Sequence, residues 1–466
     1  MKNHGMNPYL PSWEYVPDGE PHVFGKRVYI YGSHDRFAGY AFCQNDYVCW
    51  SAPVDDLTDW QYEGIIYTRA EAAHNEDGRQ CLYAPDVTCG PDGRYYLYYA
   101  LNETSAISVA VCDTPAGKYT YYGDVHYPDG TTLGARPGDE QQFDPGVLTE
   151  GETTWLYSGF CPPMMPGRTG ALCYRLASDM LTVEQTYPAV VPGAQTAKGT
   201  GFEGHAFFEA SSIRKYFIYS SELSHELCYA VSDSPCRGFV YGGTLVDNAD
   251  LGLCDTARYF TGNNHGSIEQ INGRWYVFYH RHTNSSMFCR QGMVEPIEIL
   301  PDGRIPQVEI TTSGPSGAPL PAVELRELPA YAACNLYMTQ PPQVNAEAGQ
   351  NPFPYITQDG ADVMPESESK PEAYICNLTP GTVVGFKYLN FQNVTKVSVK
   401  TRGMCYYGGF DVLLTADGEP IGTVSAARGN EWRWQTTELA IPDGISAIYF
   451  RMKGYGTLSL AAVKFH

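Results

Sequence analysis

Residues 207–219, FFEASSIRKYFIY, carry the pattern around which the first two thirds of the chain is organised. A carboxylate, Glu209, stands at the head of one strand, and an aromatic-rich strand follows after a short turn. Aromatic and β-branched residues between turn formers are typical of short β-strands. The same order of strand opening, turn and aromatic strand occurs four more times, at residues 18–31, 84–98, 143–157 and 265–279.

The five copies recur at a nearly constant interval. Subtracting positions gives steps of 59 to 67 residues between the last aromatic residues of the inner strands, which are Tyr31, Tyr98, Tyr157, Tyr219 and Tyr279. A unit of about 60 residues with about four short strands is typical of a propeller blade. We therefore predict an all-β fold with a five-bladed β-propeller over residues 1–312. The alternative, an ordinary β-sandwich with accidental spacing, does not explain five ordered recurrences.

The remainder of the chain differs in composition. Residues 313–330 begin rich in Pro, Gly, Ser and Thr, which predicts a linker or a wrapping connection. From residue 331 to 466, short strand-like runs are separated by Asp-Gly turns at 417–418 and 443–444. This pattern predicts a β-sandwich as a second domain over residues 331–466.

Composition and charge restrict the partners. The 466 residues carry a net charge of -21, which argues against nucleic acid and against anionic lipid, because both need a basic protein surface. A neutral ligand such as a sugar is compatible with this charge. No apolar run reaches the length of a bilayer span, and the start of the chain is polar, so we expect a cytoplasmic protein. The 14 cysteines show no Cys-x-x-Cys pair and are expected to be reduced core residues.

The strand openings supply the candidate chemistry. Innermost strands of a propeller surround a central channel, so residues that open them can converge at one end of it. Several of these openings carry carboxylates, and paired carboxylates on either side of a bond hydrolyse glycosides. A third carboxylate raises the pKa of the acid, since like charges oppose ionisation. For any one of these residues alone, the simpler interpretation is a turn or cap residue.

The order of motifs over residues 7–300 resembles glycoside hydrolase family 43, the five-bladed arabinofuranosidases and β-xylosidases. The matching motifs are NPYLP (7–11), APDV (84–87), FDP (143–145), FE (208–209) with Ser212 after it, HGS (265–267) and CRQ (289–291).

The resemblance implies an inverting enzyme with a general acid, a general base and a third carboxylate that tunes the acid. Glu209 matches the acid and Asp144 the tuning residue. The family's first-blade motif is usually Asp-Pro, followed by one variable residue and an aliphatic one, and residues 20–23, EPHV, fit this frame with Glu in place of Asp. Glu20 is therefore favoured as the base, and Asp18, two residues earlier, is the alternative.

Three further residues match positions near the sugar in this family. Asp86 matches a blade-two aspartate beside the sugar, and Arg290 matches an arginine that reaches it. His265 matches a histidine near the propeller axis, which in many relatives helps to hold a hydrated calcium ion. The resemblance thus implies Ca²⁺ at the axis, although a single His contributes little unless waters complete the shell. The simpler interpretations are a turn residue, a surface ion pair and a core histidine.

The segment from residue 331 onward loosely resembles a family 6 carbohydrate-binding sandwich. Tyr406, Tyr407 and Trp432 could stack on sugar faces, and the alternative for all three is packing inside the sandwich or between domains.

The sequence thus predicts an inverting, exo-acting glycoside hydrolase that releases arabinofuranosyl or xylosyl units from plant-derived oligosaccharides, as in xylan degradation. One alternative is a galactofuranosidase or another furanosidase on the same scaffold. The other is a non-catalytic, sugar-binding propeller, which only the Glu in place of Asp at residue 20 favours.

Overall fold

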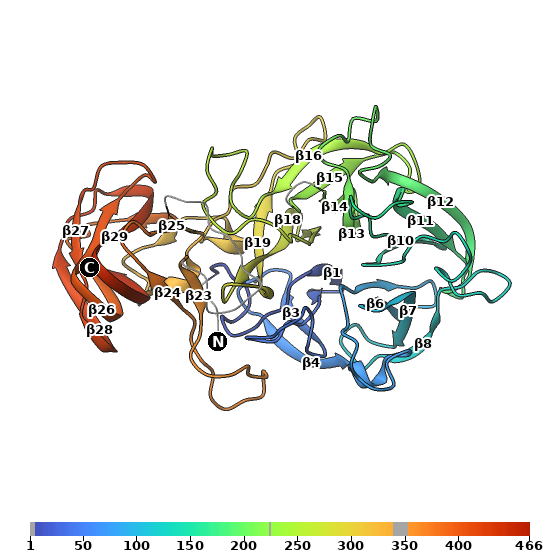
Figure 1. The fold of residues 1–466 in the computed structure, drawn as a ribbon, viewed down its shortest axis with the longest axis horizontal. Helices are drawn as coiled ribbons and strands as arrows, with labels where there is room; N and C mark the ends of the chain where they lie inside the picture. The colour runs from blue at the N-terminus through green and yellow to red at the C-terminus, as the bar shows by residue number, and fades with distance from the viewer. Residues whose placement is uncertain (1–4, 223–224, 339–352) are drawn as a thin grey trace.

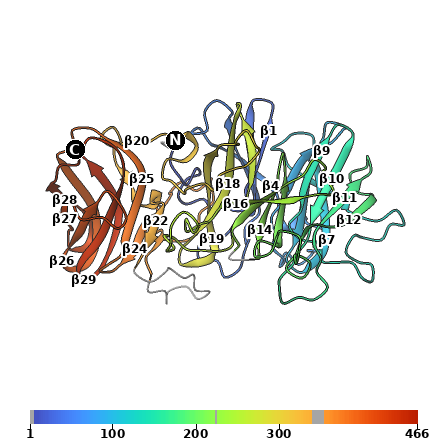
Figure 2. The same cartoon turned by 90° about the horizontal axis from the view of Figure 1, so that it is seen from above.

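The computed structural model describes residues 5–222, 225–338 and 353–466. Residues 1–4 of the polar N-terminal run and residues 339–352 of the predicted second domain lie outside these ranges. Within them the chain is nearly all β, and the helical turns are three short 3₁₀ segments, Arg69–Glu71, Gly314–Ser316 and Ala330–Ala332. The described residues include no helix that is long and apolar enough to cross a membrane. Figure 1 shows a ring of small sheets, and Figures 1 and 2 both show a separate sheet beside it.

Five antiparallel sheets form the ring, which confirms the five-bladed propeller. The first two blades are β1 (Glu20–Phe24), β2 (Arg27–Tyr31), β3 (Tyr47–Pro53) and β4 (Gln61–Tyr67), then β5 (Asp86–Cys89), β6 (Tyr95–Leu101), β7 (Thr104–Cys112) and β8 (Thr120–Asp124). The next two are β9 (Gly146–Glu150), β10 (Thr153–Ser158), β11 (Gly170–Leu176) and β12 (Val183–Pro192), then β13 (Phe207–Ile213), β14 (Phe217–Ser221), β15 (Leu227–Val231) and β16 (Val240–Val246). The fifth consists of β17 (Ser267–Ile271), β18 (Arg274–Thr283) and β19 (Ser286–Ile297).

The first strand of each blade lies at the axis, because β1, β5, β9, β13 and β17 contact one another across the blades. The five tyrosines that mark the repeat are buried, but they lie on the second strand of each blade. Their interpretation as inner-strand residues was therefore wrong by one strand. It is the residues around the start of each first strand that converge on the axis.

The N-terminal segment closes the ring against the fifth blade. Asn7 exchanges two hydrogen bonds with Val294 on β19, its Nδ2 donating to the carbonyl at 3.0 Å and its Oδ1 accepting from the amide at 2.9 Å. The amide of Asn7 also donates to the carbonyl of Thr312 at 3.0 Å. The start of the chain is thus held between the last blade and the segment that leaves it.

The second unit is one curled sheet (Figure 2), and its apolar core continues to Met6, Tyr259 and Phe260 of the propeller. The long strands β26 and β29 pair with each other along most of their length. Residues 313–330 carry β20 and β21, which join this sheet, so the stretch wraps onto the second unit. The strands are β20 (Leu320–Pro321), β21 (Leu328–Pro329), β22 (Asn335–Tyr337), β23 (Tyr355–Thr357), β24 (Tyr374–Leu378), β25 (Val383–Phe391), β26 (Lys396–Leu413), β27 (Gly422–Ser425), β28 (Gly429–Glu438) and β29 (Gly444–Phe465).

A buried ion pair ties the curled sheet to the propeller. Lys387 on β25 is 1% exposed, and its Nζ lies 2.8 Å from Asp250 Oδ2 and 3.0 Å from Glu309 Oε1. Removing either buried partner would leave an uncompensated charge, so this contact fixes how the two parts meet.

Candidate active site

A pocket of about 570 Å³ opens at the mouth of the propeller, a volume in the usual range for small-molecule sites. Among the residues predicted from the sequence, those that line it are Asp18, Asp144, Glu209, His265 and Arg290. They come from the first, third, fourth and fifth blades or from the segments that lead into them. The structure thus brings five of the seven predicted site residues together.

Glu209 reaches the pocket from an irregular strand. The pairing of β13 with β14 shifts register on both sides of Glu209, and the next residue, Ala210, has a φ of 64°. A bulge of this kind bends a strand and redirects a side chain, and bulges are frequent beside active sites. The irregularity turns Glu209 toward the pocket while its neighbours Phe207 and Ala210 stay buried.

The environment of Glu209 favours its protonated form. Burial, and then the negative charge of Asp18, raise the pKa of Glu209 to about 8, although Arg290 opposes the shift. At neutral pH this carboxyl therefore holds a proton that it can donate.

Asp144 precedes β9 in a left-handed backbone conformation, with a φ of 41°. Gly146, two residues on, approaches β13 so closely that a Cβ would lie 2.0 Å from the carbonyl oxygen of Ser211. Only glycine fits there, which brings the start of β9 against the strand of Glu209. Burial, and then the charges of Glu209 and Asp18, raise the pKa of Asp144 well above its usual value.

Asp18 is ionised at neutral pH, unlike Glu209. Its Oδ1 lies 2.9 Å from Arg290 Nη1 and 3.2 Å from His280 Nδ1. Burial alone would raise the pKa of Asp18, but the Arg290 charge and the contact with His280 outweigh it and hold the pKa well below its usual value. The pocket thus places an ionised carboxylate, Asp18, beside two carboxyls whose pKa values are raised, Glu209 and Asp144.

Arg290 is held in place by a second carboxylate. Its Nε donates to Asp35 Oδ2 at 2.8 Å and its Nη2 donates to Asp35 Oδ1 at 3.0 Å, while Nη1 points to Asp18. A bidentate pair of this kind fixes the plane of the guanidinium. Arg290 is 3% exposed, so one face of it remains on the pocket while Asp35 lies behind it.

His265 lies between three carboxylates. Its Nδ1 is 3.7 Å from Asp18 Oδ1 and 3.8 Å from Asp144 Oδ2, and its Nε2 is 3.9 Å from Glu20 Oε1. Burial lowers the pKa of His265 to about 4, with Asp18 opposing the shift and His280 and Arg290 adding to it. The ring is therefore neutral at pH 7, the form in which a His binds a metal ion.

Glu20 and Asp86 are the two predicted residues that do not line the pocket in the described structure. Glu20 is 1% exposed, and its Oε2 accepts a hydrogen bond from Ser212 Oγ at 2.9 Å. The oxygens of Asp86 bind His22 Nε2 and the amide of Val147, both at 2.7 Å. Asp86, the first residue of β5, thus links three blades.

Arg214, which the sequence reasoning missed, fills the axis beneath the pocket. Its Nη2 lies 2.8 Å from His22 Nε2, 3.6 Å from Glu20 Oε2 and 3.8 Å from Asp86 Oδ1. Its Nε lies 3.5 Å from Glu269 Oε2 on the fifth blade. The sequence feature that could have indicated Arg214 is its position, because it is a charged residue directly after the buried strand β13.

Aromatic rings surround the mouth of the pocket. Consecutive members of this aromatic collar have ring centroids 4.2 to 6.4 Å apart. Such rings give a pocket its apolar wall, while the few polar groups orient the ligand. The collar consists of Phe42, Tyr83, Phe143, Phe160, Phe208 and His225, all of which line the pocket.

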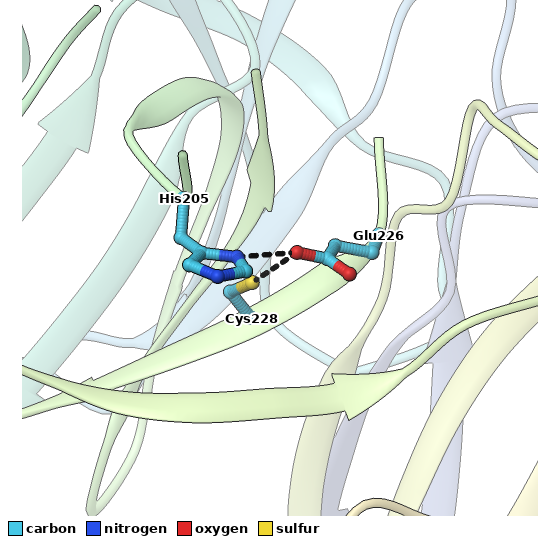
Figure 3. A group of neighbouring side chains, drawn as sticks. All are labelled: His205, Glu226 and Cys228. Atoms are coloured by element: carbon cyan, nitrogen blue, oxygen red, sulfur yellow. Dashed lines mark hydrogen bonds and ion pairs between the residues drawn. The ribbon is translucent and has the colours of Figure 1, made fainter. Parts of the chain in front are cut away.

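A second group of ligand-type side chains lies beside the pocket and is shown in Figure 3. His205 Nδ1 lies 2.6 Å from Glu226 Oε1, and Cys228 Sγ lies 3.5 Å from the same oxygen. The His205 ring stacks on Tyr241 with a centroid distance of 4.6 Å. Because one carboxylate oxygen already accepts both hydrogen bonds, we interpret this group as a structural contact that holds the segment before β13 against the start of β15.

A proton donor and an ionised carboxylate in one pocket are the two groups that glycoside hydrolases use. A family model for glycosyl hydrolases family 43 matches residues 14–305. A xylosidase/arabinosidase from Thermoclostridium stercorarium is 54% identical over 473 residues, covering 99% of this chain and 98% of that protein. The chain therefore belongs to glycosyl hydrolases family 43.

Other relatives are more distant. A xylosidase/arabinosidase from Bacteroides ovatus is 29% identical, covering 65% of this chain and 97% of that protein. A family 43 arabinoxylan arabinofuranohydrolase from Bacillus subtilis, solved with cellotetraose, has a TM-score of 0.53 at 22% identity and covers 100% of this chain and 98% of that one. A β-xylosidase/α-arabinofuranosidase from a compost microbial metagenome was solved with xylotriose in a calcium-free form. It has a TM-score of 0.52 at 23% identity and covers 66% of this chain and 98% of that one. At these identities the two solved structures support the fold alone.

Proposed function

We propose that this glycoside hydrolase is an inverting, exo-acting enzyme that releases xylosyl or arabinofuranosyl units from plant-derived oligosaccharides. The observation that carries the proposal is the opposite protonation state of Glu209 and Asp18 in one pocket. The relative that is 54% identical over almost the whole chain is a xylosidase/arabinosidase, which supports the two sugars.

In this proposal Glu209 donates its proton to the glycosidic oxygen as the bond to the anomeric carbon breaks. Asp18 accepts a proton from a water molecule, whose oxygen forms the new bond on the opposite face of the sugar. Arg290 orients Asp18, and Asp144 titrates together with Glu209, so the two carboxyls retain a proton between them because their charges would repel each other. The two carboxyl groups are expected roughly 6.5–9.5 Å apart, the separation that leaves room for the water.

We assign the base to Asp18 and not to Glu20, which the Asp-Pro frame had favoured. Asp18 lines the pocket, whereas Glu20 lies behind it against Ser212. Burial, and then the charge of Asp86, raise the pKa of Glu20 well above its usual value, although Arg214 opposes the shift. A protonated carboxyl outside the pocket is a poor acceptor for a proton from water.

Nitrophenyl glycosides test the proposed substrates. We expect hydrolysis of the β-xyloside or the α-arabinofuranoside, with the anomer released first, as seen by NMR, inverted relative to the substrate. Hydrolysis of the galactofuranoside alone would instead identify another furanosidase. Failure to hydrolyse any of the three would favour a sugar-binding propeller without catalysis.

We propose that His265 and Glu20 would hold a calcium ion at the axis. Glu20 Oε1 is buried, has no hydrogen-bond partner among the described residues, and faces His265 Nε2 at 3.9 Å. A carboxylate oxygen, an imidazole and waters suit the flexible shell of calcium. When bound, the ion would add positive charge beneath the pocket. Calorimetric titration with calcium, compared with His265→Ala, tests this site.

We also propose that the curled sheet binds carbohydrate in the manner of a family 6 module, with residues 331–466 as its extent. Tyr407 is 92% exposed, so its ring is open to a ligand, whereas Tyr406 is 51% exposed and has the Arg428 guanidinium 4.1 Å from its ring centroid. Trp432 packs edge-on against Tyr374 at 5.1 Å and lies under Arg402 at 4.4 Å, which supports a packing role for it. Retention on insoluble xylan by the parent but not by Tyr407→Ala would support binding.

Asp144→Asn is expected to move the alkaline limb of the kcat–pH profile, which should lie near pH 8 in the parent, to lower pH. Asp144 and Glu209 repel each other when both are ionised, so they titrate as a coupled pair. Removing the Asp144 charge removes this repulsion, and Glu209 then loses its proton at lower pH. Profiles with kcat and KM separated measure the shift. An unmoved limb with a raised KM would mean that Asp144 only binds a sugar hydroxyl.

A further inference from the structure

A segment of the curled sheet lies on the propeller beside the pocket. Tyr15 Oη donates to Gln358 Oε1 at 2.9 Å, and the amide of Asn284 donates to the carbonyl of Ile356 at 2.6 Å. Thr357 Oγ1 donates to Asn284 Oδ1 at 2.9 Å. Residues 356–362 thus follow the propeller surface between the segment before β1 and the turn between β18 and β19.

Asp362 ends this run of contacts and binds a loop of the first blade with both carboxylate oxygens. Its Oδ1 accepts a hydrogen bond from the amide of Phe37 at 2.9 Å, and its Oδ2 accepts one from Asn45 Nδ2 at 3.0 Å. The two donors stand near opposite ends of the loop between β2 and β3, residues 35–45, which we name the wall loop. One side chain of the second unit therefore holds the wall loop at both ends.

The wall loop forms one side of the pocket. Phe42 and Cys43 line it, and Phe42 also lies against Arg290 with the guanidinium carbon 4.8 Å from the ring centroid. At the base of the loop, Asp35 Oδ1 accepts from the amide of Cys43 at 3.0 Å and also binds Arg290. The position of the loop thus sets the position of a collar ring and of the carboxylate that orients Arg290.

The wall loop has no strand or helix of its own, and Tyr40 at its tip is 84% exposed. Loops of this kind depend on tethers for their shape, since little buried area holds them. Asn45 Nδ2 supplies one tether inside the blade by donating to the carbonyl of Asp35 at 3.1 Å. Arg290 binds Asp35 from the fifth blade, and the charge-assisted contacts from Asp362 add tethers from the second unit.

We propose that Asp362 is a positioning residue for the sugar pocket, through which the curled sheet sets the shape of the pocket wall. The inference rests on the proposed function, because it takes this pocket as the place where the terminal sugar binds. The curled sheet would then contribute to recognition of the sugar at the catalytic pocket as well as on its own surface.

Asp362→Ala tests the proposal by two independent measurements. Hydrogen–deuterium exchange of peptides that cover residues 35–45 is expected to become faster, because the amide of Phe37 loses its acceptor. KM for the hydrolysed nitrophenyl glycoside is expected to rise roughly five- to tenfold, with kcat within about twofold, because a charge-assisted contact that shapes the ground-state pocket is lost. Asp362→Asn keeps one acceptor and the side-chain volume, so its effects should be smaller.

Asp359→Asn is the matched control, three residues earlier in the same segment. Asp359 binds Arg402 at 2.7 and 2.9 Å and Tyr374 Oη at 2.8 Å, all within the curled sheet. The Asp359→Asn variant is expected to leave the hydrogen–deuterium exchange of the wall loop and KM at parent values.

Unchanged exchange in Asp362→Ala would overturn the tether, and faster exchange with an unchanged KM would overturn the role of Asp362 in sugar binding. A parent without hydrolytic activity would contradict the proposed function, while the exchange measurement would still report on the tether.

Discussion

Glu209→Gln is expected to lose about 10³-fold in kcat on xylo-oligosaccharides, whose leaving sugar must receive a proton. General acid catalysis typically contributes about 10²–10⁴-fold, and glutamine has no proton to give. On a dinitrophenyl glycoside the loss should be far smaller, because that leaving group departs as a stable anion. The comparison of both substrates, with parent and variant at the same pH, measures the difference.

Folding should be preserved in this variant, since the side chain of Gln has nearly the volume of the protonated Glu that burial favours at this site. Glu203→Gln, at an exposed position on the loop before β13, is the control for an uncharged substitution. Equal loss on activated and unactivated substrates would contradict the assignment of Glu209 as the acid.

Asp18→Asn is expected to reduce kcat by about 10³-fold on both kinds of substrate, because every turnover needs a base for the water. Glu20→Gln separates the two candidates for this role. Glu20 lies outside the pocket with a raised pKa, so Gln reproduces the shape of its neutral form and kcat should stay within about tenfold of the parent. Steady-state kinetics of the pair decide the matter, and an inactive Glu20→Gln beside an active Asp18→Asn would return the base to Glu20.

The repeat in the sequence was sufficient to predict five blades, because each copy keeps the order of opening, turn and aromatic strand. It also placed Glu209, Asp144 and His265 at one pocket, since all three stand close to the start of a first strand. Glu20 and Asp86 were misplaced for a common reason. Each is the first residue inside its strand, where hydrogen bonding directs the side chain to neighbouring blades.

The backbone at Asp18 could not be predicted from a motif frame. Asp18 has a φ of 57° and turns the chain before β1 begins, so the carboxylate that meets the pocket stands two residues ahead of the matching frame. The aromatic collar could not be predicted from the sequence either, because Phe42 and Phe160 come from connections between strands. The tether from Asp362 joins positions more than 300 residues apart, and no local pattern carries that information.

Arg214 and its neighbours Glu20 and Asp86 block the centre of the propeller beneath the pocket. A sugar cannot pass through a ring that is closed at its centre, so a product released in the pocket must leave through the same mouth by which the substrate entered. Entry and exit then compete for the same opening. We expect the freed sugar to obstruct the next chain end in proportion to its concentration, so that turnover slows as product accumulates unless another process removes the monosaccharide.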